Sequence, residues 1–180
     1  MVFPTHRLVR DLPNFDKEAV LEKCSEFFYI DEKEGTDTME EDLKKLYDEG
    51  KKAFGFYCGK GEWFLLTLKN IDFMSQMLPN VSKASQSLDV SVLHTLILEK
   101  IFGIDKENMA KQINLTYTKF FTEAIDGVDK GEFQCSFVLN PTRVTEIRDV
   151  AAAGEKMPQK STYFYPKMIT GMVMNNLGVD

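Results

Sequence analysis

The 180 residues have the length of one ordinary domain, and a 43% hydrophobic content with 14 Phe excludes a disordered chain. The formal net charge of −6 gives no basic footprint, so we expect neither nucleic acid nor an anionic membrane surface as a partner. The most apolar stretch, residues 90–102, is interrupted by polar and charged side chains and is shorter than the roughly 20 apolar residues of a membrane span.

The cysteines and histidines are too few and too scattered for most metal chemistry. Cys24, Cys58 and Cys135 form no CxxC pair, which predicts reduced, buried thiols in a cytoplasmic protein. The two histidines, His6 and His94, lie far apart, and no HxxxH, HExxH or DxDxDG pattern is present. We therefore predict no metal site, and the first residues show no targeting leader.

The first fifty residues predict two helices with a short strand between them. Asn14 is placed to cap a helix whose apolar residues recur at helical spacing, and residues 28–30 then have the character of a strand. Thr38 and Glu41 have the spacing of a capping box, and Gly50 ends the apolar stripe that follows them.

The middle of the chain predicts a hairpin followed by a buried helix. Two aromatic-rich runs, 53–58 and 62–68, are separated by three residues that include two glycines, which indicates an antiparallel hairpin with a three-residue loop. The polar segment 79–87 is expected to be an exposed loop. Residues 89–102 then predict a helix whose apolar side chains on several faces indicate deep burial.

The last third continues the alternation of helices and strands. Because a purely parallel sheet cannot contain the hairpin, we predict an α+β fold, with a mixed sheet that includes one antiparallel hairpin and with flanking helices. We expect residues 1–180 to form a single globular domain. The remaining predicted elements are a helix at 105–112, a strand at 113–117, a helix at 122–128, a strand at 133–139, a helix begun by Asn140-Pro141 and ended by Gly154, and an extended tail at 161–177.

Two histidines are the candidate catalytic residues. His94 lies on the predicted apolar helix, where a dry cleft would keep it neutral as a general base, and the alternative is a core histidine with one hydrogen-bond partner. His6 stands beside Arg7, whose guanidinium is suited to orient a phosphate or carboxylate. The alternative for this pair is a solvated strand end.

The segment 154–167 is a local basic island in an acidic chain. It resembles a P-loop superficially, but Gln159 occupies the position of the second glycine and the segment follows a predicted helix instead of a strand. A different kind of anion site is the sharper prediction, and a solvated surface connection is the alternative. The candidate anion-binding residues are Arg7, Lys156, Lys160, Ser161 and Thr162.

Three blocks of the chain together resemble a known family. They are residues 4–9 (PTHRLV), 88–97 (LDVSVLHTLI) and 154–171 (GEKMPQKSTYFYPKMITG). They are similar to the C-terminal portion of a bacterial family called domain of unknown function 1015. The resemblance implies a protein about twice this length, with an upstream Ala-Asp-Gly-His-His-Arg block similar to that of the ParB and sulfiredoxin-like nucleotide-binding superfamily. That block is absent here, so the resemblance implies that this chain is a C-terminal part.

Two functional hypotheses follow. In the first, the chain and its upstream domain form an enzyme that acts on a small phosphorylated metabolite or a nucleotide, with serine metabolism as one suggestion of the family resemblance. In the second, the chain is a non-catalytic scaffold or homodimerisation module that supports an upstream catalytic domain, as the apolar stretch 90–102 suggests. The substrate, the reaction and the oligomeric state stay open at this point.

Overall fold

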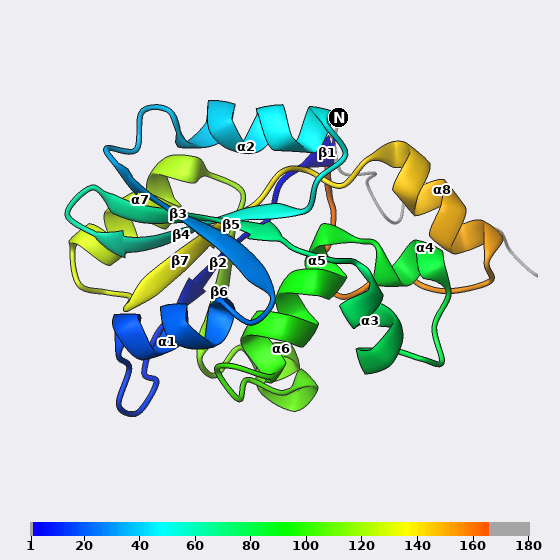
Figure 1. Cartoon of the computed structure of the whole chain (residues 1–180), viewed down its shortest axis with the longest axis horizontal. Helices are drawn as coiled ribbons and strands as arrows, with labels where there is room; N and C mark the ends of the chain where they lie inside the picture. The colour runs from blue at the N-terminus through cyan, green and yellow to red at the C-terminus, as the bar shows by residue number, and fades with distance from the viewer. Residues whose placement is uncertain (1, 166–180) are drawn as a thin grey trace, which may run out of the picture.

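The computed structural model describes residues 2–165, and a six-stranded sheet runs through its centre (Figure 1). The strand order is β3-β5-β4-β7-β2-β6. The first strand of this sheet along the chain, β2, therefore lies between two strands from the second half of the chain. The strands of this sheet are β2 (His6–Val9), β3 (Phe28–Glu34), β4 (Ala53–Gly59), β5 (Glu62–Leu68), β6 (Leu115–Thr118) and β7 (Cys135–Val138).

Every strand pair among the described residues is antiparallel, including the pair in a second, two-stranded sheet of β1 (Val2–Phe3) and β8 (Tyr163–Phe164). The predicted α+β class is confirmed. The predicted mixture of parallel and antiparallel strands is not found in this part of the chain, because neighbouring strands alternate in direction even where their connections are long. Residues 166–177 of the predicted extended tail lie outside the described residues.

Helices cover both faces of the central sheet (Figure 1). α2 (Met39–Asp48) and α7 (Phe121–Asp129) pack on one face, and their buried residues form one apolar cluster with the sheet. The other face carries a larger cluster, which includes buried residues of α1 (Lys17–Cys24), α3 (Asp72–Met77), α5 (Asp89–Val92), the π-helix η1 (Leu93–Glu99) and α6 (Lys106–Lys111). The last two helices, α4 (Lys83–Gln86) and α8 (Val144–Ala152), pack against each other.

Aromatic side chains fill the layer between the sheet and the larger group of helices. Phe56 and Phe137 face each other across β4 and β7 with their rings stacked, 5.0 Å apart between centroids. Each is fully buried, which contributes roughly 1.5–3 kcal/mol per side chain. On the opposite face, a Cβ on Gly55 would stand only 3.0 Å from Met39 Sδ, so a larger residue there would have to displace the Met39 side chain of α2.

The local predictions are right about most elements and wrong about several of their ends. α1 begins at Lys17 and its cap is Asp16, whose side chain accepts a hydrogen bond from Ala19 N, whereas Asn14 lies before the helix at φ +54°. The predicted capping box of α2 does not form, because the Thr38 oxygen accepts no hydrogen bond from a backbone N–H of the first turn, and its hydroxyl donates to the Asp42 carboxylate.

The hairpin of β4 and β5 is confirmed, with a tighter turn than predicted. β4 extends to Gly59, so only Lys60 and Gly61 lie between the strands. Both have positive φ, at 57° and 79°, as a two-residue turn between twisted strands requires.

The segment 79–87 is not the exposed loop that its polarity predicts. It contains α4, where Ser85 and Gln86 are buried. The Gln86 amide donates to the carbonyls of Leu78 and Val81, and these bonds offset the loss of its hydration. Similarly, Asn140 does not cap α8, which begins after Arg143.

Within residues 2–165, no helix is both long and apolar enough to cross a membrane, and no group of His, Cys, Asp and Glu side chains has the arrangement of a metal site.

Candidate functional site

The helix predicted at 89–102 contains a π-helical segment, η1, that follows directly on α5. Its widened turns are marked by hydrogen bonds that skip five residues, such as that from Phe102 N to Ile97 O at 2.9 Å. The apolar side of η1 is buried against the sheet, while His94 and Thr95 on its other side face a cavity. Since π-helical turns are rare and concentrate at functional sites, η1 directs attention to His94.

Arg7 is the central cation of this site and is completely buried. One terminal nitrogen of its guanidinium donates to Thr5 O. The other lies 3.1 Å from Lys160 O and 3.1 Å from His94 Nε2, and the guanidinium carbon is 5.1 Å from the centroid of the Tyr117 ring. Nε has no hydrogen-bond partner in the described part of the chain. No carboxylate contacts Arg7 there, so its positive charge is not balanced.

The strand register explains why these groups meet. Side chains alternate along β2, so Arg7 points towards the side of η1 while His6 points towards the side of α7. Arg7 and Tyr117 are direct cross-strand partners in the pairing of β2 with β6. The sheet therefore places Tyr117 beside Arg7, and η1, which packs on this face of the sheet, places His94 in contact with Arg7.

Burial and charge determine the proton positions in the site. Burial lowers the pKa of Arg7 to about 10, which still leaves the guanidinium protonated at neutral pH. Burial, and then the charge of Arg7, lower the pKa of His94 well below its usual value, so this imidazole is neutral. Because Arg7 can only donate, His94 Nε2 must accept, and the ring proton resides on Nδ1. His94 Nδ1 has no hydrogen-bond partner among residues 2–165.

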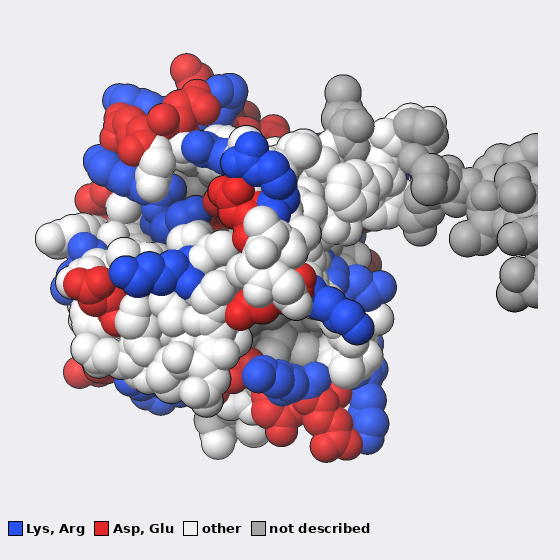
Figure 2. Space-filling model, turned by 90° about the vertical axis from the view of Figure 1, so that its right-hand side faces the viewer, with Lys and Arg blue, Asp and Glu red and all other residues white. Residues whose placement is uncertain are grey.

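The cavity next to His94 has a volume of about 630 Å³, which is within the range of small-molecule sites. Tyr117 and His94 form part of its wall, and Arg7 lies behind them. Figure 2 shows the side of the molecule that carries α4, α6 and α8, where the surface is hollowed between basic and acidic side chains. The charged residues that line the cavity are Glu99, Lys106, Glu155 and Lys156.

One wall of the cavity is the segment 155–160, which we call the strap. Glu155 fastens its beginning to the region of α4, since its carboxylate accepts from Ser82 N at 2.7 Å, from Ser82 Oγ at 2.8 Å and from Ser85 Oγ. These bonds lower the pKa of Glu155. The end of the strap is fastened by the Lys160 carbonyl on Arg7. Lys156 lies between these two anchors and lines the cavity.

The predicted site residues are only partly brought together. Arg7, His94 and the backbone of Lys160 are in contact, and Lys156 lines the same cavity. Thr162 and the Lys160 side chain instead line a second hollow of about 300 Å³, on the other side of Tyr117.

Two predicted residues lie away from the cavity. Ser161 is buried, and its carbonyl accepts a hydrogen bond from Thr142 at 2.9 Å. His6 is also buried, and its Nδ1 accepts from Leu139 N at 3.2 Å on the opposite face of the sheet from His94. Burial, and then Arg7, lower the pKa of His6 to about 4. His6 and Arg7 are therefore not a solvated strand end, because both are inside the protein.

Sequence reasoning missed Tyr117 and Glu155. Tyr117 lies in the predicted strand 113–117 with no local sign of a site, and its place beside Arg7 depends on the pairing of segments about 110 residues apart. Glu155 was overlooked as the one acid of a basic segment, although its position next to Lys156 could have marked it as an anchor.

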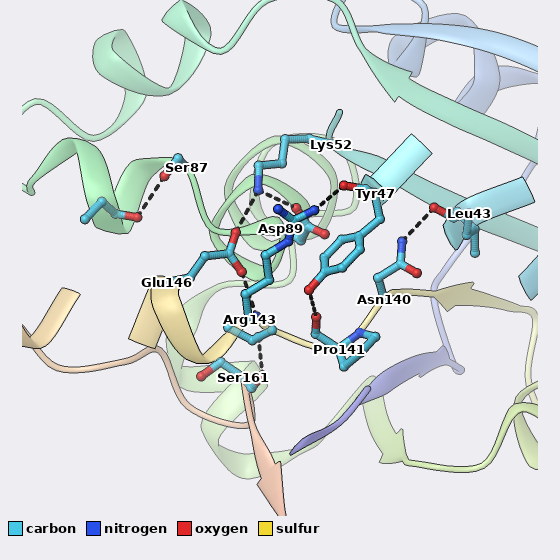
Figure 3. Close-up of polar contacts among 12 residues, drawn as sticks. Leu43, Tyr47, Lys52, Ser87, Asp89, Asn140, Pro141, Arg143, Glu146 and Ser161 are labelled. Carbon is cyan, nitrogen blue, oxygen red and sulfur yellow. Dashed lines mark hydrogen bonds and ion pairs between the residues drawn. The ribbon is translucent and has the colours of Figure 1, made fainter. Parts of the chain in front are cut away.

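A second buried polar cluster lies between β4, α5 and α8 (Figure 3). Lys52 Nζ is 2.9 Å from Asp89 Oδ1 and 3.0 Å from Glu146 Oε1, and each of the three side chains is less than one fifth exposed. Burial acts to lower the pKa of Lys52, but the two carboxylates outweigh it and raise that pKa. Burial raises the pKa of Asp89 against the attraction of Lys52.

Arg143 completes this cluster. Its guanidinium lies 3.9 Å from the centroid of the Tyr47 ring and donates to the Tyr47 carbonyl, while its backbone N–H donates to Glu146 at 2.9 Å. Two cations therefore stand among two carboxylates, Asp89 and Glu146. The cluster is balanced in charge and needs no ligand to neutralise it, unlike the surroundings of Arg7.

The comparisons with known proteins give a family and no activity. The model of a family described as "Protein of unknown function (DUF1015)" matches residues 1–91, which contain Arg7, Lys52 and Asp89 but neither His94 nor the strap. No curated protein and no solved structure matches the chain. Since the match covers half of the sequence, the chain belongs to the DUF1015 family of proteins of unknown function.

Proposed function

We propose that this chain binds a small phosphorylated metabolite or a nucleotide by its phosphate in the cavity beside His94, as part of an enzyme. The observation that carries the proposal is the fully buried Arg7, which has no carboxylate partner within residues 2–165. A buried cation without a counterion is costly to the protein, and an anionic ligand would remove that cost. The cavity lies directly beyond the residues that Arg7 contacts.

The donors that a phosphate requires are available at the cavity wall. The Nδ1–H of His94 has no partner among the described residues, and Arg7 polarises it by donating to Nε2 of the same ring. Lys156 offers an ammonium group from the strap. In this arrangement His94 acts as a hydrogen-bond donor and not as the general base that its sequence position suggested, because its basic nitrogen already accepts from Arg7.

The proposal also concerns the protein to which the chain belongs. We take the chain to be the C-terminal part of a longer, cytoplasmic bacterial protein whose upstream domain completes the cleft. The three free cysteines support a cytoplasmic location, because thiols stay reduced in that compartment. Burial raises the pKa of the Cys24 thiol to about 12, and it raises the pKa of Cys58 to the same value, so both stay protonated and unreactive.

Calorimetric titration with inorganic phosphate, AMP and a sugar phosphate tests the proposal. We expect His94→Leu to weaken binding about tenfold, because a hydrogen bond to a charged group contributes roughly 1.5–3 kcal/mol. Lys156→Ala should weaken it less. The matched control is Lys44→Ala. Lys44 is an exposed lysine that pairs with Asp48 in α2, and this helix lies on the face of the sheet opposite the cavity. Absence of binding, or equal affinities for all three variants, would refute phosphate binding in this cavity.

The scaffold hypothesis loses the observation that motivated it. Leu93, Leu96 and Leu98 of the apolar helix are buried within the chain itself, against its own sheet, and offer no surface to a partner. Dimerisation stays a prediction, and sedimentation velocity over a range of concentrations would test it.

A further inference from the structure

The contact between Arg7 and the strap is chemically weaker than the one that Arg7 is suited to make. The Lys160 carbonyl is a neutral acceptor, 3.1 Å from the guanidinium. Hydrogen bonds between a guanidinium and an oxyanion are roughly twice as strong as bonds between neutral groups, and they also balance the charge. The carbonyl therefore occupies a position where an anionic oxygen would be held more tightly.

The strap is anchored at its two ends by different means. At its beginning, the Glu155 carboxylate accepts from the backbone N–H and hydroxyl of Ser82 and from the hydroxyl of Ser85. These bonds do not involve Arg7. At its end, Lys160 contacts Arg7 through its carbonyl, while the next residue, Ser161, is held separately because its own carbonyl accepts from Thr142 at 2.9 Å. The Lys160 carbonyl can therefore leave Arg7 while Glu155 and Ser161 stay in place.

The backbone at Lys160 is held in an unfavourable conformation. Its φ is +54°, in the left-handed region that residues with a Cβ avoid and glycine adopts freely. This conformation directs the carbonyl to Arg7, and it adds an internal cost to the closed strap. Release of the carbonyl would allow Lys160 to return to an ordinary conformation.

We propose that the Lys160 carbonyl is a placeholder for an oxyanion of the ligand, so that a phosphate group and the strap compete for Arg7. Binding of the anion to the guanidinium displaces the carbonyl and loosens the strap next to Lys160, between the anchors at Glu155 and Ser161. This inference rests on the proposed function, because it assigns to the same phosphate a direct contact with Arg7.

Two substitutions of Lys160 isolate the backbone from the side chain. Lys160→Gly and Lys160→Ala both remove the ammonium group, but only glycine favours the left-handed conformation. Glycine should therefore hold the strap closed and alanine should loosen it. Because a competing closed state lowers apparent affinity in proportion to its population, inorganic phosphate should bind the glycine variant about fivefold more weakly than the alanine variant.

Lys60 provides the matched control. It lies at φ +57°, is exposed, and belongs to the turn between β4 and β5, which does not border the cavity. Lys60→Gly and Lys60→Ala should differ in stability but bind phosphate with the same affinity. Hydrogen exchange of the native chain provides the direct readout, because saturating phosphate should speed exchange of the amides in 156–161.

The results separate this inference from the proposed function. Phosphate binding that depends on His94, with equal affinities for the two Lys160 variants or with slower exchange in 156–161, would show that the carbonyl stays on Arg7 and would overturn the inference alone. Absence of phosphate binding by the native chain would refute the proposed function, and the inference with it.

Discussion

Arg7 lies in β2 and Lys52 lies directly before β4 of the same sheet. Both cations are largely buried, but their surroundings differ. Lys52 lies between two carboxylates at 2.9 and 3.0 Å, and both belong to the described chain. Arg7 contacts two carbonyls, an imidazole nitrogen and an aromatic ring, and none of these carries a negative charge. Burial of a charge does not by itself point to a ligand, since Lys52 is neutralised within the protein. A buried charge that has no counterion among residues 2–165, as at Arg7, is what favours an anionic ligand.

The two cations also hold the same two segments at opposite ends. Lys52 binds Asp89 at the beginning of α5, and Arg7 binds His94 in the η1 segment that continues it. Lys52 binds Glu146 in α8, and Arg7 binds Lys160 in the strap that follows this helix. We therefore expect the Lys52 cluster to fix the frame of the cavity and the Arg7 site to respond to a ligand.

The largest effect is expected from Lys52→Ala. The substitution leaves two largely buried carboxylates close together with Arg143 as their one remaining cation among the described residues, which should lower the free energy of unfolding by about 3 kcal/mol. Urea denaturation measures this change. A loss below about 1 kcal/mol would contradict the view that Lys52 neutralises the cluster, and Lys52→Arg should recover part of the stability.

Acidification should affect the surroundings of Arg7 through His6. An unfolded histidine takes up its proton near pH 6.5, whereas folded His6 does so only near its pKa of about 4. The unfolded state therefore binds more protons in this window, and stability falls as the pH falls from 6.5 towards 4. Between pH 7 and pH 5 the native chain should lose about 2 kcal/mol more than His6→Gln does. Parallel stability curves for the two proteins would disprove a neutral, buried His6.

Arg7→Met should cost less stability than Lys52→Ala, about 1 kcal/mol, although Arg7 is the more deeply buried residue. The substitution removes an unbalanced charge from the interior and leaves only neutral acceptors without a donor. The same variant should lose phosphate binding by tenfold or more. Denaturation and calorimetry on one preparation measure both effects, and a stability loss equal to that of Lys52→Ala would remove the contrast between the two cations.

The smallest effect is expected from Lys44→Ala on the surface of α2. Lys44 pairs with Asp48 one helical turn away, and both side chains are more than half exposed. Such pairs contribute little, so unfolding should change by no more than about 0.5 kcal/mol. A larger change would mean that exposed pairs matter here as much as buried ones.

Elements defined by local patterns could be predicted from the sequence, and elements defined by distant partners could not. The hairpin at Lys60 and Gly61, α2 and α6 follow from spacing and turn residues within a few positions. The polar helix α4 could not be predicted, because the hydrogen bonds that satisfy the buried Gln86 amide come from residues outside this helix, Ser75 and Leu78. The π-helical turns of η1 have no sequence signal that distinguishes them from α-helix.

The candidate site shows the same division. His94, Arg7 and the basic segment were singled out by residue type, but their contact depends on β2, η1 and the strap meeting in three dimensions. Residue type also grouped His6 with Arg7, although alternation along β2 sends the two side chains to opposite faces of the sheet. No periodicity could show that Lys160 would contribute its carbonyl and not its ammonium group.

The place of β2 in the sheet has a consequence for folding. Both neighbours of this strand, β6 and β7, come from residues 115–138, whereas β3, β4 and β5 pair within residues 28–68. The first seventy residues can therefore form a three-stranded sheet early, but Arg7 gains its first neighbouring strand only when the chain has grown past Thr118, and its second only past Val138. The region 1–91 that matches the family model also lacks both neighbours of β2. A protein cut at residue 91 would therefore leave the Arg7 guanidinium exposed to water. In the whole chain, Arg7 becomes a buried cation only at a late step of folding.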